Sequence, residues 1–201
     1  MKMINRARVV ILIPATVLSI CLPGGVRAQS ASGAFETISV GLGPTLQLNR
    51  TLLDDAWESP WGIVGFVETP FYFGRVQAGV EFLPYAGLVS SVPDFNVFHF
   101  YLDWSALIHL PWKLHSSNGF RLGLFQYHFD DENAGIHQRV ERELCTSFVT
   151  GIQHDFTEKW TIRLTASFGT VFLSEPVRQV FITVSLSRLF ISPEWLQDLL
   201  K

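Results

Sequence analysis

The feature that most constrains this chain is a strict alternation of apolar and polar residues. Between residues 36 and 190, apolar side chains recur at every second position in five segments, and three further segments, 61–69, 120–130 and 140–154, show a less regular form of the pattern, which gives eight segments of about 9–14 residues in all. A period of two is typical of β-strands whose two faces meet different surroundings. We therefore predict an all-β protein with eight antiparallel strands in an up-and-down order. The predicted strands cover residues 36–48, 61–69, 75–84, 97–110, 120–130, 140–154, 160–172 and 179–190.

The polar face of these strands distinguishes two kinds of β-barrel. In a soluble barrel the apolar face points inward, whereas in an outer-membrane barrel it meets lipid and the lumen is polar. Here the polar face mixes small residues, such as Gly41, Gly79 and Ser105, with charges of both signs. That mixture fits a narrow eight-stranded lumen filled by side chains. We expect a transmembrane β-barrel, with a soluble periplasmic barrel that binds an apolar ligand as the alternative.

The first 28 residues have the three-part layout of a secretory signal peptide. Basic residues precede an apolar run over residues 9–20, and small residues lead to a cleavage position after Ala28. The run is too short for a membrane-spanning helix, which needs about 20 residues. Four of the 15 Lys and Arg residues precede the cut, so the mature chain has 11 against 18 acidic residues, a net charge of −7. This charge argues against nucleic acid as a partner.

Three regions follow from this organisation. Residues 1–28 form the signal peptide, residues 29–190 the barrel and residues 191–201 a periplasmic extension. Ser192 can cap a helix, Pro193 suits its first turn and Glu194 favours its positive end. The extension is therefore predicted to be a short helix. Cys145 is the one cysteine left after cleavage, so no intramolecular disulfide can form.

The chain resembles the small eight-stranded outer-membrane barrels of Gram-negative bacteria, of the OmpA-domain and OmpX type. The resemblance covers residues 34–190 and rests on the strand pattern and on the last strand, residues 180–190, which ends in Phe190. That strand is similar to the signal that barrel-assembly machinery recognises, although Arg188 stands where an apolar residue is usual. The resemblance implies a bacterial outer-membrane location and no cofactor. It implies no single activity, because this architecture supports adhesins, anchors and enzymes.

Charged and polar side chains on the predicted lumen face are the first group of candidate site residues. An unpaired charge in a narrow barrel is costly, so we expect a structural pairing network, with a proton path or small-ion pore as the functional alternative. Glu81 and His99 fall opposite each other across the loop over 84–96 and are expected to pair. The predicted network comprises Arg75, Glu81, His99, Asp103, His109, Arg121, Glu141, Glu143 and Arg163.

Two polar residues, Gln126 and His128, interrupt the apolar face near the outer end of the fifth predicted strand. Counting across the loop over 130–138 places Arg142 beside Gln126 on the same outward face. Polar groups there would contact lipopolysaccharide head groups, and Arg142 can bind phosphate. The acidic run over 130–132 could bind divalent cations between lipids. The simpler alternative is a β-bulge that restores the phase of the strand.

An enzymatic alternative comes from lipid A deacylases of the PagL type, which are also eight-stranded barrels with a lipid-facing His-x-Ser motif and a nearby Glu. Here His128 is followed by Asp130 in place of the serine, so the nucleophile is missing. His115 and Ser117 match the motif, but the predicted topology puts them in a periplasmic turn. We therefore expect a monomeric, non-enzymatic barrel for surface contact or envelope integrity, with a lipid A-modifying hydrolase as the alternative. No metal-binding motif is found in the sequence.

Overall fold

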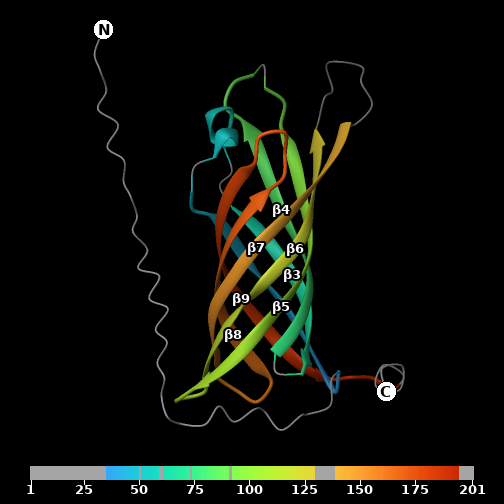
Figure 1. The fold of residues 1–201 in the computed structure, drawn as a ribbon, viewed down its shortest axis with the longest axis vertical. Helices are drawn as coiled ribbons and strands as arrows, with labels where there is room; N and C mark the ends of the chain where they lie inside the picture. The colour runs from blue at the N-terminus through green and yellow to red at the C-terminus, as the bar shows by residue number, and fades with distance from the viewer. Residues whose placement is uncertain are drawn as a thin grey trace, which may run out of the picture.

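Eight long strands form one closed antiparallel sheet (Figure 1). The computed structural model describes residues 35–49, 51–58, 61–72, 74–90, 92–129 and 139–194. The first long strand pairs with both the next long strand and the last, so the barrel has no free edge. This closure confirms the predicted eight-stranded barrel. The long strands are β1 (Thr37–Gln47), β3 (Gly62–Phe71), β4 (Gly74–Gly87), β5 (Phe95–Leu110), β6 (Leu114–Phe129), β7 (Arg139–Asp155), β8 (Trp160–Val171) and β9 (Val177–Ile191).

The apolar face of the strands points outward. Leu42 on β1, Leu102 on β5 and Leu122 on β6 expose 63%, 56% and 59% of their surface. Residues of the opposite face, such as His99 and Arg121, are buried inside the barrel. This orientation is the one that an outer-membrane barrel requires and the reverse of a soluble barrel.

The two ends of the barrel carry different connections. Thr37 pairs with Ile191, so the chain enters and leaves the barrel at one end, the lower end in Figure 1. The connections at this end, residues 72–73, 111–113 and 156–159, are short. Two of the opposite connections, 88–94 and 130–138, are longer. The connection between β1 and β3, residues 48–61, contains the helix η1 (Leu52–Asp55) and the short strand β2 (Trp57–Glu58). Short turns face the periplasm in outer-membrane barrels, so we call the lower end periplasmic and the upper end outer.

Strand β6 begins at Leu114, six residues before the start that the sequence pattern predicted. The predicted turn over 111–119 was therefore wrong, and residues 111–113 make the connection. Trp112 and Lys113 have φ values of 61° and 57°, as a type I′ turn requires at both central positions. Residues 114–119 show no apolar alternation, yet their backbone pairs with β5 and β7. His115 and Ser117 consequently lie on a strand and not in a turn.

The outer end of β6 keeps a regular register. Gln126 pairs with Arg142, and the ladder continues through His128 to Phe129. The bulge considered from the sequence is therefore absent from β6, and Gln126 and His128 face outward. Phe125, which precedes Gln126, and Tyr127, which separates Gln126 from His128, point inward and are buried.

The lumen has two layers of different chemistry. Its periplasmic half is polar, but its outer half is filled by apolar side chains that we call the plug. The expectation of a polar lumen throughout was wrong, because several strands are apolar on both faces near their outer ends. The plug consists of Leu83, Tyr85, Phe95, Val97, Phe125, Tyr127, Cys145, Val171 and Phe181.

Both chain termini extend past the described barrel. The predicted signal peptide, residues 1–28, lies outside the described residues. The predicted C-terminal helix is not supported, because Ile191 belongs to β9 and residues 195–201 lie outside the described residues. Within the described ranges, no helix has the length and apolar character needed to cross a membrane.

Candidate functional site

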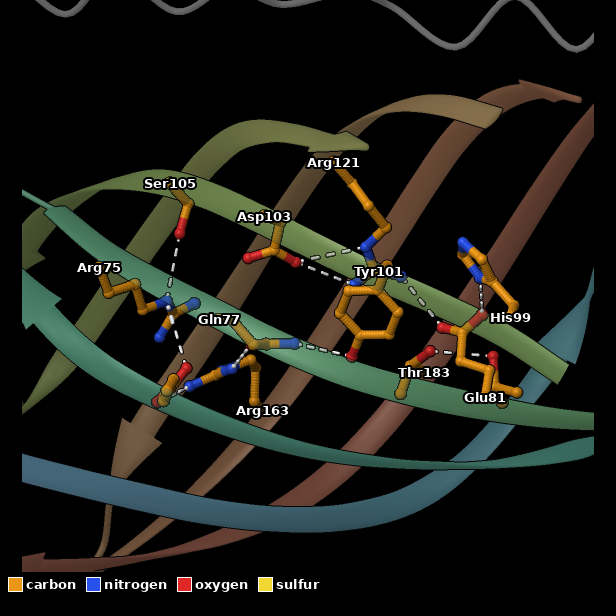
Figure 2. A network of polar contacts seen from close by, with 12 residues as sticks. Arg75, Gln77, Glu81, His99, Tyr101, Asp103, Ser105, Arg121, Arg163 and Thr183 are labelled. Atoms are coloured by element: carbon orange, nitrogen blue, oxygen red, sulfur yellow. Dashed lines mark hydrogen bonds and ion pairs between the residues drawn. The ribbon is translucent and has the colours of Figure 1, made fainter. Parts of the chain in front are cut away.

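Arg121 on β6 is the centre of a buried network in the polar half of the lumen. Its Nη1 donates to Oε1 of Glu81 on β4, and its Nη2 donates to Oδ2 of Asp103 on β5, both at 3.0 Å (Figure 2). Its guanidinium also lies 3.5 Å from the ring centre of Tyr101. All four side chains are buried. Two carboxylates and one aromatic face therefore surround this cation.

A second group of ion pairs lies nearer the periplasmic end. Arg163 on β8 donates to Oε1 of Gln77 at 3.0 Å and pairs with Glu68 on β3 at 2.5 Å. The other oxygen of Glu68 lies 3.5 Å from Nε of Arg75. Gln77 donates to the hydroxyl of Tyr101 at 2.8 Å and so joins the two groups. Three arginines and three carboxylates thus balance each other within one connected network.

At its outer edge the network meets the plug through His99. Nδ1 of His99 lies 2.8 Å from Oε2 of Glu81, and Nε2 lies 3.2 Å from Sγ of Cys145. The ring of Phe125 stacks on the imidazole with centroids 4.2 Å apart. A carboxylate, an imidazole and a thiol in this order are the components of a nucleophilic triad. Here His99 and Cys145 are almost completely buried. Their contact joins the plug to the network.

Glycine at position 123 makes this contact possible. Gly123 lies on the inward face of β6, paired with Tyr101 of β5 and Cys145 of β7. A Cβ atom there would overlap the imidazole of His99 and crowd Sγ of Cys145. The absence of a side chain at Gly123 therefore lets the imidazole of His99 pack closely against the inner wall of the barrel.

The structure brings six of the nine predicted lumen residues into this network and places three elsewhere. Glu141 and Glu143 occupy inward positions of β7 beside Tyr127 and Phe125, near the outer end. His109 lies at the periplasmic opening of the lumen. The six that meet are Arg75, Glu81, His99, Asp103, Arg121 and Arg163.

Sequence reasoning missed Glu68, Gln77 and Gln153 as members of the network. Glu68 accepts from Arg163, and Gln153 accepts from Arg75. The stretch over 61–69 is rich in glycine and apolar on both faces, so its alternation did not assign Glu68 to the lumen. The one available signal was the charge itself, because an acidic residue in an otherwise apolar strand needs a buried cation.

Three side chains form a separate cluster at the periplasmic opening. Nδ1 of His109 lies 2.6 Å from Nδ1 of His115, and Nε2 of His115 lies 2.8 Å from Oδ2 of Asp155. Asp155, and not Ser117, is thus the hydrogen-bond partner of His115, while Ser117 is buried deeper in the lumen. Within the described ranges, no group of three or more His, Cys, Asp or Glu side chains is arranged to surround a metal ion.

The predicted lipid head-group residues lie together on the outward face at the outer end; we call Gln126, His128 and Arg142 the rim patch. Gln126 and Arg142 are paired across β6 and β7, and Nε2 of Gln126 lies 2.8 Å from Nε2 of His128. The ring of Phe98 packs edge-on against His128 with centroids 5.4 Å apart. Asp130, the other residue of the enzymatic alternative, lies outside the described residues.

Comparisons with known proteins identify the fold. No protein-family model matches this sequence. No curated protein matches it either. Among solved structures, the chain is similar to Neisserial surface protein A, with 12% identity over 79% of this chain and 99% of that one and a TM-score of 0.56. It is also similar to Ail, the attachment invasion locus protein of Yersinia pestis, solved in complex with the heparin analogue sucrose octasulfate, with 12% identity, coverage of 77% and 98%, and a TM-score of 0.51. The fold is that of the small eight-stranded outer-membrane barrels.

Proposed function

We propose that this protein is a non-enzymatic barrel of the bacterial outer membrane that acts through its outer surface, in envelope integrity or surface contact. The observation that carries the proposal is the combination of an apolar exterior and a filled lumen. A belt of exposed Leu, Val, Ile and Phe side chains surrounds the barrel, and lipid is the surrounding that such a belt requires. A filled interior leaves the outer loops and the rim as the surfaces that can meet partners.

The filling of the lumen argues against transport as the main function. The cavity among Tyr101, Arg121 and Arg163 has a volume of about 20 Å³, which is enough for about one water molecule. The plug closes the outer half above it. An ion crossing the barrel would have to displace both the paired charges of the network and the aromatic side chains of the plug.

The rim patch is the proposed contact for lipopolysaccharide phosphates. Arg142 is exposed on the outward face and stands beside Gln126 at the outer end. A guanidinium there can bind a phosphate through two parallel hydrogen bonds, with an amide and an imidazole as further polar contacts. The acidic run over 130–132, which we expect to bind divalent cations, lies outside the described residues.

The outer connections differ in charge from a surface that would bind a sulfated polymer. Their described parts contain the acidic residues Asp54, Asp55, Glu58, Asp94 and Glu175, and no Lys or Arg. We therefore do not transfer to this chain the heparin-analogue binding that the Ail structure records. A cationic or cation-bridged partner fits these loops better.

The enzymatic alternative receives less support from the rim. Nε2 of His128 lies beside the amide of Gln126, a group that can be neither a nucleophile nor an acid–base partner. The second histidine of that alternative, His115, lies at the periplasmic end beside Asp155. A lipid A assay on cells that express the chain tests this alternative directly, since a hydrolase would change the acyl content of lipid A.

Heat-modifiable gel migration tests the barrel and its location together. Membranes from cells that express the full chain are separated, and the outer-membrane fraction is run with and without boiling. A closed barrel is expected to migrate differently in the two samples, because only the boiled barrel is unfolded. Recovery of the protein in the soluble periplasm would overturn the proposal.

The lipid contact is tested by comparing two outward-facing arginines at opposite ends. In Arg142→Ala the rim patch loses its charge, whereas Arg188→Ala removes an arginine that lies over Trp160 and Phe190 at the periplasmic end. Binding of lipopolysaccharide to the folded barrel is measured in detergent. Loss of one charge-assisted contact is expected to weaken binding roughly tenfold in Arg142→Ala and to leave Arg188→Ala unchanged. Equal affinity of the two variants would exclude the rim patch.

A further inference from the structure

We propose that His109 and His115 form a binding site for a transition-metal ion at the periplasmic opening of the barrel. The two residues are direct cross-strand partners on β5 and β6. They flank the turn over 111–113, whose two positive φ values fix the hairpin. The backbone therefore holds both imidazoles on the same face, next to each other. This site is at the opposite end from the rim patch and does not depend on lipid binding.

The two imidazoles direct the same kind of atom at each other. Nδ1 of His109 lies 2.6 Å from Nδ1 of His115, with the ring planes at 85°. Neutral imidazole nitrogens either donate or accept, so this contact requires one shared proton between the two lone pairs. A metal ion can take the place of that proton and accept both lone pairs at once.

Asp155 determines which nitrogen of His115 is available. Its Oδ2 lies 2.8 Å from Nε2 of His115, and its Oδ1 accepts from the hydroxyl of Thr161 on β8 at 2.5 Å. A carboxylate at Nε2 holds the proton there and leaves Nδ1 as a lone pair aimed at His109. A carboxylate hydrogen-bonded to the distal nitrogen is the usual support of a metal-binding histidine, and it also raises the basicity of the ligand nitrogen.

The geometry needs only a small adjustment to accept an ion. Metal–nitrogen bonds to zinc are about 2.0–2.1 Å long, so two imidazole nitrogens around a tetrahedral ion stand about 3.3 Å apart. His109 is exposed at the end of β5 and can move by that amount without disturbing the lumen. The site lies at the periplasmic opening, where water can supply the remaining ligands.

The chemistry of the ligands selects the class of ion. Imidazole nitrogen suits Zn²⁺, Ni²⁺ and Cu²⁺ and is a poor ligand for Ca²⁺ or Mg²⁺. Among these ions Cu²⁺ is expected to bind most tightly and Zn²⁺ more weakly. Both histidines must be unprotonated at Nδ1 to bind, so acid competes with the metal.

Calorimetric titration of the untagged, folded full barrel in detergent with CuCl₂ and with ZnCl₂ tests the site. One ion per barrel is expected near neutral pH, with binding lost at pH 5. His109→Ala and His115→Ala are each expected to weaken binding at least roughly tenfold, and Asp155→Asn to weaken it roughly 10–100-fold. His128→Ala, at the other end of the barrel, is the matched control and is expected to bind normally. Heat-modifiable migration checks that each variant is folded.

Two results would overturn the site. One is the absence of saturable binding to the parent barrel, and the other is an equal loss in the control variant and in His109→Ala. Electron paramagnetic resonance of the Cu²⁺ complex gives an independent measurement, because two equivalent imidazole nitrogens produce a characteristic coupling. A Cu²⁺ spectrum that lacks coupling to two nitrogens would also refute the assignment.

Discussion

The guanidinium of Arg121 lies 3.5 Å from the centre of the Tyr101 ring, in the middle of the lumen. This contact places an aromatic face on one side of a cation whose other sides meet Glu81 and Asp103. The hydroxyl of the same tyrosine accepts from Gln77. Tyr101 thus joins the two ion-pair groups, and the network behaves as one unit. Stability should therefore depend strongly on its central cation.

Replacement of Arg121 by methionine tests that dependence. Arg121→Met leaves the carboxylates of Glu81 and Asp103 buried without their cation, so we expect a loss of about 3–5 kcal/mol in the free energy of unfolding. Urea unfolding of the folded barrel in detergent measures it. Arg142→Met on the exposed rim is the control, with an expected change within about 0.5 kcal/mol. A triple variant that adds Glu81→Gln and Asp103→Asn should recover much of the loss, and failure to recover any would show that packing, and not charge, is lost.

Two glycines on β3 and β6 provide a sharper test of packing in the lumen. In Gly123→Ala the new Cβ overlaps the imidazole of His99, whereas in Gly65→Ala it meets only Cδ1 of Leu42 on the lipid face, at 3.8 Å. We expect Gly123→Ala to cost about 1–3 kcal/mol and Gly65→Ala to be neutral or slightly stabilising. Unfolding midpoints in urea compare the two. Equal midpoints would mean that His99 moves freely to make room.

Much of the fold could be predicted from the sequence because strand alternation is a local signal. The outward direction of the apolar face followed from the small and charged residues of the other face, and the pairing of Glu81 with His99 followed from counting across a loop. The first six residues of β6 could not be predicted in this way. Residues 115–119 are polar or glycine on both faces, and their strand conformation comes from pairing with two neighbours.

The plug and the periplasmic cluster were missed for a different reason. At the outer end of β6 the apolar residues Phe125 and Tyr127 face the lumen, whereas near Leu122 the apolar residues face outward. One unbroken alternation therefore cannot describe both parts of the strand. The cluster of His109, His115 and Asp155 depends on the register of three strands. With β6 predicted to start at 120, His115 had no cross-strand partner to meet.

The direction of the apolar face can be tested at two depths. Leu122 lies in the middle of β6, and Leu48 follows the outer end of β1; both are exposed. If lipid surrounds the barrel, Leu122→Arg should cost about 2–4 kcal/mol and Leu48→Arg about 0–1 kcal/mol, because the cost of a charge rises toward the middle of the bilayer. Folding into lipid vesicles in a urea series measures both. A soluble barrel would give the same small cost at both positions.

The plug is expected to protect Cys145 from reagents on the outer side. Phe95 is at its centre, with ring contacts to Trp57, Tyr85 and Tyr127. Cys145 should not react with a maleimide in the folded barrel, because the thiol is buried. It should react once boiling has unfolded the barrel.

Phe95→Ala removes the central ring of the plug, and the cavity that it leaves costs about 3–5 kcal/mol. We expect the rate of Cys145 labelling in this variant to rise roughly tenfold or more, since the opening of the plug needs correspondingly less free energy. Phe120→Ala removes an equal ring from the lipid face, where Phe120 is 70% exposed, and should leave the rate unchanged. Fast labelling of Cys145 in the parent barrel would show that the lumen is open at its outer end. Small molecules could then enter the interior, which a closed plug would prevent.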